Sequence, residues 1–235
     1  ENLRILSENF KHLIVLLNVG GVIDTSYIRR LPHLSALVLT GQSGGTTGLA
    51  AADVLTGRVT PEGKLTATWA EKYEDYPNAE SYGAMNGNLD DEWYTEGIYT
   101  GYRYFDSFGT PVRYPFGYGL GYGKIEFGSV SAGLDGCDVT VSAELVNTGE
   151  THAASELMQV YVTRPGDDLT RPVSFLQAFS KSRLLAPGEN QTIRLRFPIT
   201  DLAVYRESAH AFVLDAGYYL SLIHISEPTR LDVIS

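Results

Sequence analysis

Apolar residues near the N-terminus follow first the spacing of a helix and then that of buried strands. Within the first ten residues, Leu3, Leu6 and Phe10 lie roughly on one side of a helix. Two short and almost wholly apolar runs follow at residues 13–17 and 35–40, as in strands that are buried on both faces of a parallel sheet. This pattern predicts part of an α/β domain.

Helices are expected on either side of the two runs. Residues 24–31 suit a short helix, and residues 47–55 are small and apolar enough to pack on the sheet, with Gly57 placed to end that helix. The order helix–strand–helix–strand–helix implies right-handed parallel crossovers. Two strands are too few to bury both faces of such a sheet, so we expect the rest of the domain upstream of residue 1.

The pattern changes twice in the middle of the chain. Residues 65–69 suggest an edge strand, and the polar residues 71–92 suggest a long loop of the kind that is usually functional or disordered. Residues 93–127 then hold 12 of the chain's 26 aromatic residues, with glycines interleaved. Regular strands do not need so many glycines, so this stretch predicts an ordered but irregular connector.

From residue 138 onward the apolar period becomes two. Residues 139–145 and 192–197 alternate apolar and polar side chains, and further strands are expected at 156–163 and 174–181. Short strands at this spacing, separated by turns rich in glycine and proline, predict a β-sandwich. The expected fold class is therefore α/β plus all-β.

Charge and composition exclude several classes of function. The chain has 235 residues and a formal net charge of −10, which argues against a nucleic-acid binder because such a protein needs a basic face. No apolar run is long enough to span a bilayer, so no membrane partner is expected. A single cysteine and five histidines without ligand spacing predict no metal site. No cofactor is expected: the Gly-rich loop 41–48 lacks the phosphate-loop signature.

Several segments, in this order, resemble glycoside hydrolase family 3, in particular its bacterial β-glucosidases with a fibronectin type III-like C-terminal domain. The most specific are YTEGIYTGYRYFD at 94–106 and YPFGYGLGY at 114–122. In the first part, IVLLNVG at 14–20 and PEGKL at 61–65 also match, and the sandwich matches at VNTG, QVYV and LAPGE. The resemblance covers about residues 1–220. It implies the C-terminal half of an α/β sandwich domain at 1–92, the connector at 93–127 and a fibronectin type III-like sandwich at 128–220.

Two segments depart from the family pattern. GGTTG at 44–48 stands where the family has a Gly-Gln-Glu-Gly-like loop, which puts a sugar contact by the family's glutamate in doubt. The last residues, from about 221 to 235, do not continue the family's final strand and are similar to the peptide read from a sequencing adapter. We expect this tail to be non-native, so its His224 and Glu227 are not site candidates.

The resemblance implies a retaining β-glycosidase, with two carboxyl groups as nucleophile and general acid/base. It places both groups upstream of residue 1, the nucleophile on an N-terminal barrel domain that this chain lacks. We therefore expect this fragment to be the non-catalytic portion of a β-glucosidase-like enzyme that hydrolyses terminal β-linked sugars. On its own it should be inactive, and its partners should be the carbohydrate substrate and the missing barrel. With the N-terminus absent, the sequence does not decide between a cytoplasmic and a secreted parent.

Aromatic side chains can stack on sugar rings, and this suggests residues that line the substrate. The candidates are Tyr82, Met85, Trp93, Tyr94 and Glu96. The alternative for most aromatic residues of the connector is packing between domains. For Glu96 and Asp106 the alternative is pairing with Arg103 or capping of turns.

A second hypothesis for the whole chain is a non-catalytic carbohydrate-binding or scaffold module that stands alone. The two hypotheses differ in the surface that they predict. A fragment of an enzyme should expose an apolar face where the missing part docks, whereas a stand-alone module should have a closed, polar surface.

Overall fold

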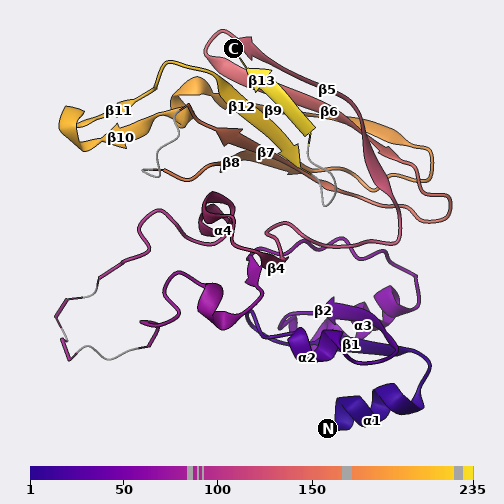
Figure 1. The fold of residues 1–235 in the computed structure, drawn as a ribbon. Helices are drawn as coiled ribbons and strands as arrows, with labels where there is room; N and C mark the ends of the chain where they lie inside the picture. Colours follow the sequence, from indigo (N-terminus) through magenta and orange to yellow (C-terminus); the bar gives the residue numbers. More distant parts are fainter. Residues whose placement is uncertain (84–86, 89, 92, 166–170, 225–229, 235) are drawn as a thin grey trace.

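The computed structural model has an α/β part, a connector and a β-sandwich, which lie one above another (Figure 1). It describes residues 1–235 except 84–86, 89, 92, 166–170, 225–229 and 235, and for 221, 222, 224 and 230–234 it describes the backbone alone. The connector runs between the other two parts and contacts both.

The α/β part follows the predicted order of elements. It consists of α1 (Asn2–Asn9), β1 (Leu13–Leu17), α2 (Ser26–Arg29), β2 (Leu34–Leu39), a short 3-10 helix (Gly44–Thr46) and α3 (Thr47–Leu55). Strands β1 and β2 are parallel, and no other described strand pairs with either of them. Gly57, with a φ of 74°, lies just after the end of α3, as expected for a residue that stops a helix.

The two faces of this small sheet differ sharply in burial. Side chains of one face, with α2 and Trp69, form a core of Val15, Leu17, Ile28, Leu31 and Trp69. The other face is partly bare: Ile14 and Leu16 are 45% and 41% exposed. Helix α3 has no buried residue, and its Leu49 is 73% exposed. An uncovered apolar face of this kind is what a truncated α/β sheet predicts.

The middle of the chain has more regular structure than its glycines suggest. Strand β3 (Trp69–Ala70) pairs antiparallel with β4 (Val112–Tyr114), and between them lie a 3-10 helix (Tyr73–Asp75) and α4 (Tyr102–Phe108). The prediction of a strand at 65–69 was therefore wrong in extent. Helix α4 is flanked by Gly101 at its N-terminus and Gly109 at its C-terminus, with φ values of 55° and 60°. These glycines mark the ends of a helix rather than an irregular chain.

The sandwich has two main sheets, in the strand orders β5–β6–β9 and β13–β12–β7–β8. Their strands are β5 (Ile125–Asp135), β6 (Asp138–Asn147), β7 (Leu157–Thr163), β8 (Phe175–Lys181), β9 (Asn190–Pro198), β12 (Tyr219–His224) and β13 (Arg230–Ile234). Between β9 and β12 lie a 3-10 helix (Ile199–Leu202), β10 (Val204–Arg206), a second 3-10 helix (Glu207–Ala209) and β11 (Ala211–Val213). Strands β10 and β11 form a hairpin that projects from one end of the sandwich (Figure 1).

The predicted alternation along β6 builds the sandwich core. Val139, Val141, Ala143 and Leu145 are at most 1% exposed and pack with residues of β7, β9 and β12. Strand β7 departs from alternation, because five successive residues from Met158 to Val162 are buried. One face of β7 belongs to the core, and the connector covers the other.

The C-terminal segment joins the sandwich in the structure. Strand β12 pairs with β7 over residues 220–224, and β13 pairs with β12. Ile223 is fully buried in the core. Strand pairing does not distinguish a native segment from a non-native one, so the assignment of the tail from about residue 221 stays a prediction.

Candidate functional site at the aromatic connector

The aromatic residues of the connector mostly pack on one another. Edge-on or tilted ring pairs with centroids 5.0–5.8 Å apart join Trp69–Tyr114, Tyr76–Phe105, Tyr99–Phe108, Tyr102–Phe116, Tyr104–Phe105, Tyr104–Phe108 and Tyr114–Tyr118. Such pairs contribute about 0.5–1.5 kcal/mol each beyond the area that they bury. For these rings the structure agrees with the packing alternative.

Tyr102 connects α4 to the outer face of the sandwich. Its ring lies 5.6 Å from that of Tyr161 on β7, and its hydroxyl accepts a hydrogen bond of 3.0 Å from the backbone N–H of Leu176 on β8. Gly117 passes so close to Gln159 that an added Cβ would lie 2.7 Å from the Gln159 Oε1 atom. The connector is thus fitted to β7 and β8 by both polar and steric contacts.

A buried ion pair links the α/β part to the sandwich. The Lys64 ammonium lies 2.8 Å from the Glu156 carboxylate and donates a 2.7 Å hydrogen bond to the carbonyl of Gly119 in the connector. The side chains of Lys64 and Glu156 are only 10% and 11% exposed. A second pair, between Lys181 and Glu62, lies 3.0 Å apart at the same junction. Lys64 lies in the PEGKL segment, but nothing in the sequence points to its partner.

Arg103 makes contacts that differ from the expected ones. In the described part of the chain it forms no ion pair with Glu96 or Asp106. Its guanidinium instead lies 5.2 Å from the ring centre of Phe175, a ring that Arg164 also covers at 4.2 Å. Pairing with Arg103, one of the two structural alternatives for Glu96 and Asp106, was therefore wrong, because α4 directs Arg103 toward Phe175 on the sandwich. Partial burial raises the pKa of Asp106, which fits a carboxyl group without a cation beside it.

The candidate substrate-lining residues lie on the loop before the connector and on the first residues of the connector itself. Tyr82, Trp93 and Tyr94 are 81%, 74% and 89% exposed. The backbone carbonyl of Glu96 accepts a hydrogen bond from the N–H of Tyr99, so this residue belongs to a turn. Met85 lies outside the described residues. Unlike the rings from Tyr99 onward, the three exposed aromatic side chains do not pack within this chain to any large extent.

A small apolar pocket lies between the sheet and α3. It has a volume of about 260 Å³, with walls from β1, β2, α3 and residues 60–63. Hydroxyl groups of Thr40, Ser43 and Thr47 at its rim already donate to backbone carbonyls, so they offer little to a polar ligand. The pocket is suited to an apolar side chain and belongs to the uncovered face of the α/β part.

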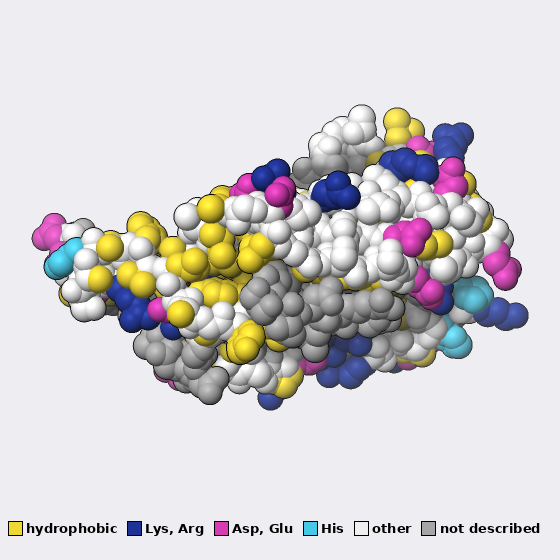
Figure 2. Space-filling model, turned by 90° about the horizontal axis from the view of Figure 1, so that it is seen from above, with side chains coloured by type: hydrophobic (Ala, Val, Ile, Leu, Met, Phe, Trp, Pro, Cys, Tyr) yellow, Lys and Arg dark blue, Asp and Glu magenta, His cyan; other side chains and the backbone are white. Residues whose placement is uncertain are grey.

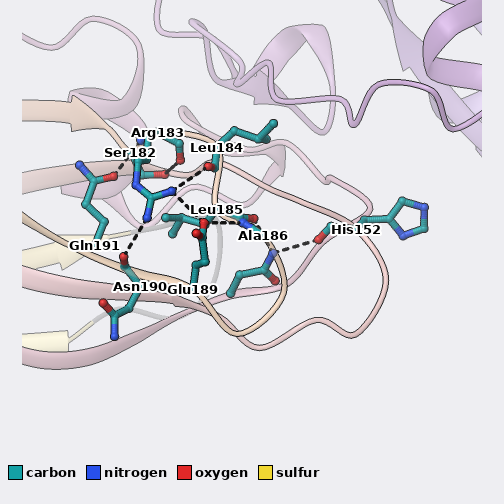
Figure 3. Close-up of polar contacts among 10 residues, drawn as sticks. His152, Ser182, Arg183, Leu184, Leu185, Ala186, Glu189, Asn190 and Gln191 are labelled. Carbon is teal, nitrogen blue, oxygen red and sulfur yellow. Dashed lines mark hydrogen bonds and ion pairs between the residues drawn. The ribbon is translucent and has the colours of Figure 1, made fainter.

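The turn between β8 and β9 is held by a polar network (Figure 3). The Glu189 carboxylate accepts the N–H of Ala186 and pairs with Arg183 at 2.8 Å, and these two contacts hold the pKa of Glu189 below its usual range. Asn147, which is fully buried, donates to the carbonyls of His152 and Leu185. This network is structural, and in it Asn147 of VNTG and Glu189 of LAPGE hold the turn.

The β10–β11 end of the sandwich is the other exposed aromatic region. Figure 2, which looks down on the sandwich, shows hydrophobic side chains gathered toward that end. Tyr205 and Phe212 pair across the hairpin and are 54% and 73% exposed. Their rings meet at 67°, so the two do not form one flat platform of the kind that stacks on consecutive sugars.

Two further features of the described residues concern metal ions and membranes. Among the described residues, no group of three or more His, Cys, Asp or Glu side chains is placed to hold a metal ion. Within the same part of the chain, no helix is both long and apolar enough to cross a bilayer.

Similarity to known proteins covers nearly the whole chain. Residues 2–122 match the glycosyl hydrolase family 3 C-terminal domain, and residues 156–226 match a fibronectin type III-like domain. Beta-glucosidase A of Butyrivibrio fibrisolvens is 34% identical over 92% of this chain, which corresponds to 28% of that protein. An exo-α-(1→6)-L-arabinopyranosidase of Bifidobacterium longum is 34% identical over 96% of this chain and 29% of its own length.

A solved structure extends the similarity to three dimensions. Beta-glucosidase 3B from Thermotoga neapolitana, in complex with glucose, superposes with a TM-score of 0.88 at 35% identity, over 99% of this chain and 33% of that one. The chain therefore spans about a third or less of the length of these relatives. By sequence and by fold, the chain belongs to glycosyl hydrolase family 3, of which it comprises the C-terminal domain and the fibronectin type III-like domain.

Proposed function

We propose that this chain is the C-terminal, non-catalytic portion of a retaining, β-glucosidase-like enzyme that hydrolyses terminal β-linked sugars. The uncovered apolar face of the α/β part carries the proposal, because Ile14, Leu16 and Leu49 are exposed where an α/β sheet is normally covered. Relatives named as β-glucosidases, of which this chain matches less than a third, support it. The missing upstream part then covers this face and supplies both catalytic carboxylates.

The chain's own contribution is to shape and hold the substrate site. In this proposal Tyr82, Met85, Trp93, Tyr94 and Glu96 line the pocket on the side of the leaving group, beside the upstream barrel. Tyr82, Trp93 and Tyr94 are the most exposed aromatic residues of their region, and an exposed ring can stack on a sugar or its aglycone. The packed rings of the connector fix the base of this loop on the sandwich.

The competing hypothesis is a stand-alone carbohydrate-binding or scaffold module. It calls for a closed, polar surface, against which the exposed Leu16 and Leu49 argue. On the sandwich, the exposed rings of Tyr205 and Phe212 meet at 67° and so form no flat platform for a sugar chain. We therefore place the substrate contacts on the loop before the connector and on the first residues of the connector, and not on the sandwich.

A chimera tests the proposal directly. The upstream two-thirds of the Thermotoga neapolitana enzyme, joined to this chain in place of its own C-terminal third, should hydrolyse nitrophenyl β-glucoside. The same upstream part alone, and this chain alone, should not. Recovery of the natural upstream sequence, with assays on nitrophenyl β-glucoside and β-xyloside, then identifies the sugar. Turnover by this chain alone, or a folded whole protein that hydrolyses no glycoside, would refute the proposal.

Substitution in the active chimera tests the lining residues. Tyr94→Ala should change KM or the preference for the leaving group and leave thermal stability unaltered, because Tyr94 makes few contacts within the chain. Tyr114→Ala is the matched control, since Tyr114 packs on Trp69 and Tyr118 and its loss should lower stability instead. Unchanged kinetics for Tyr94→Ala, Trp93→Ala and Tyr82→Ala would remove these residues from the substrate site.

A further inference from the structure

The first three residues of β9 form a motif that none of the preceding functions uses. Asn190, Gln191 and Thr192 make an Asn-X-Thr triplet, and no other Asn-X-Ser/Thr triplet occurs in the 235 residues. This triplet is the acceptor sequence for N-linked oligosaccharides, which are bulky and require a surface position. Whether a sequence match is a usable site depends on the exposure and the direction of its side chains.

The two residues of the triplet that a transferase requires, Asn190 and Thr192, face outward. Asn190 and Thr192 are exposed and Gln191 is half-buried, because the three residues alternate between the two faces of β9. The amide oxygen of Gln191 accepts the backbone N–H of Arg183, which fixes the inward direction of the middle residue. Ile193, the next residue after the triplet, is buried in the core.

The Asn190 carboxamide is available for reaction. Within the described part of the chain it forms no side-chain hydrogen bond, although the backbone carbonyl of Asn190 accepts one from Arg183. Figure 3 shows the carboxamide pointing away from the Arg183–Glu189 pair. A substituent on its nitrogen would therefore break none of the contacts that hold the turn.

Strand β9 also lies at the edge of its sheet, in the order β5–β6–β9. An edge strand presents unpaired backbone groups that can associate with other chains, and a large hydrated substituent hinders such pairing. The position of Asn190 is thus one at which an oligosaccharide fits beside an edge strand.

We propose that Asn190 is an acceptor for an N-linked oligosaccharide whenever the chain passes an oligosaccharyltransferase. The co-substrate is a lipid-pyrophosphate-linked oligosaccharide. The Asn190 Nδ2 atom forms a bond to the anomeric carbon of its first sugar, the bond from that carbon to the pyrophosphate oxygen breaks, and the lipid pyrophosphate leaves with the electron pair. The amide gives up one proton, and nothing is oxidised or reduced. Thr192 supplies the hydroxyl that the transferase recognises.

Secretion of the chain from a yeast tests this proposal. The secreted protein should migrate more slowly than the bacterially produced chain, and peptide-N-glycosidase should abolish the difference and leave Asp at position 190 in the peptide mass spectrum. Asn190→Gln and Thr192→Val should each remove the modification, whereas Thr192→Ser should retain it. The secreted protein and the bacterially produced chain should unfold at similar temperatures. An unmodified secreted protein, or a modification that survives Thr192→Val, would overturn the assignment of Asn190.

Discussion

Lys64 and Glu156 are 92 residues apart in the chain, yet they form a 2.8 Å ion pair at the meeting point of the α/β part, the connector and the sandwich. Lys64 also donates to the carbonyl of Gly119, so one ammonium group contacts all three parts. Two buried charges are tolerated when they pair with each other, because either charge alone would lose its contact with water and gain no opposite charge in its place.

Removal of one partner of this pair should therefore lower the stability of the fold. We expect Glu156→Gln to lower the free energy of unfolding by about 3–5 kcal/mol, because the Lys64 charge stays buried. In urea unfolding, Glu8→Gln is the control: it removes an exposed pair with Arg4 and should cost no more than about 0.5 kcal/mol. Equal effects of the two substitutions would show that Lys64 and Glu156 do not act as a buried pair.

The same junction should not tolerate a side chain at Gly119. An added Cβ would collide with the backbone carbonyl of Gly63, which cannot move aside as a flexible side chain can. We expect Gly119→Ala to destabilise the protein by about 1–3 kcal/mol. Gly63→Ala is the matched control, since its Cβ would have no neighbour within 4 Å. Thermal unfolding of the two variants checks the prediction, and a stable Gly119→Ala protein would contradict the described path of the connector.

The hydroxyl of Tyr102 should contribute to docking of the connector. Tyr102→Phe keeps the ring contacts with Phe116 and Tyr161 but leaves the Leu176 N–H without its acceptor. We expect a loss of about 1 kcal/mol and faster hydrogen exchange at Leu176. Tyr94→Phe removes a hydroxyl from a side chain that is 89% exposed and should change neither quantity.

The pH dependence of stability should show that the Asp215 carboxylate stabilises the fold. Its carboxylate accepts a hydrogen bond from Arg171 and pairs with Arg206, and these contacts hold the pKa of Asp215 below its usual range. A lowered folded pKa adds stability above the unfolded pKa of about 3.9, and this stability is lost as the pH falls through the folded value.

Asp215→Asn should consequently be less stable than the unsubstituted chain at neutral pH, and the difference should shrink as the pH falls through and below about 3.9. Urea unfolding at a series of pH values measures this. A difference that stays constant with pH would mean that the charge of Asp215 does not stabilise the fold.

The uncovered face of the α/β part should behave differently in the fragment and in a whole enzyme. Leu49→Ser should leave the stability of this chain within about 0.5 kcal/mol, because the side chain is 73% exposed, and should reduce its self-association. In the active chimera the same substitution should lower thermal stability. Val15→Ser, on the buried face, should destabilise both proteins. If Leu49→Ser leaves the chimera unaffected, this face does not contact the upstream part.

Local patterns were enough to predict most of the elements. The apolar runs became β1 and β2, and the period of two became β6 and β9, because in each case burial of one or both faces determines the spacing of residues. Helix α4 was missed because its glycines resemble those of an irregular chain, although Gly101 and Gly109 lie only at its ends. The β10–β11 hairpin is too short to give a periodic signal.

Contacts across the parts were beyond prediction from one sequence. Nothing near Lys64 indicates Glu156. Pairing of Arg103 with nearby carboxylates was one alternative, whereas its guanidinium lies over the rings of Tyr102 and Phe175. The substrate-lining candidates remain predictions because the surface that they would face is not in this chain. Pattern reasoning thus gives the parts of the fold, and long-range contacts decide how the parts meet.

The position of Lys64 limits how genes of this kind can recombine. A crossover anywhere between codons 64 and 156 would take the lysine from one parent and the glutamate from the other, and the glycine at 119 would come from one or the other according to the position of the crossover. Exchange of the sandwich alone would therefore succeed only between parents that share all three. Laboratory shuffling should therefore take residues 64–156 from a single parent.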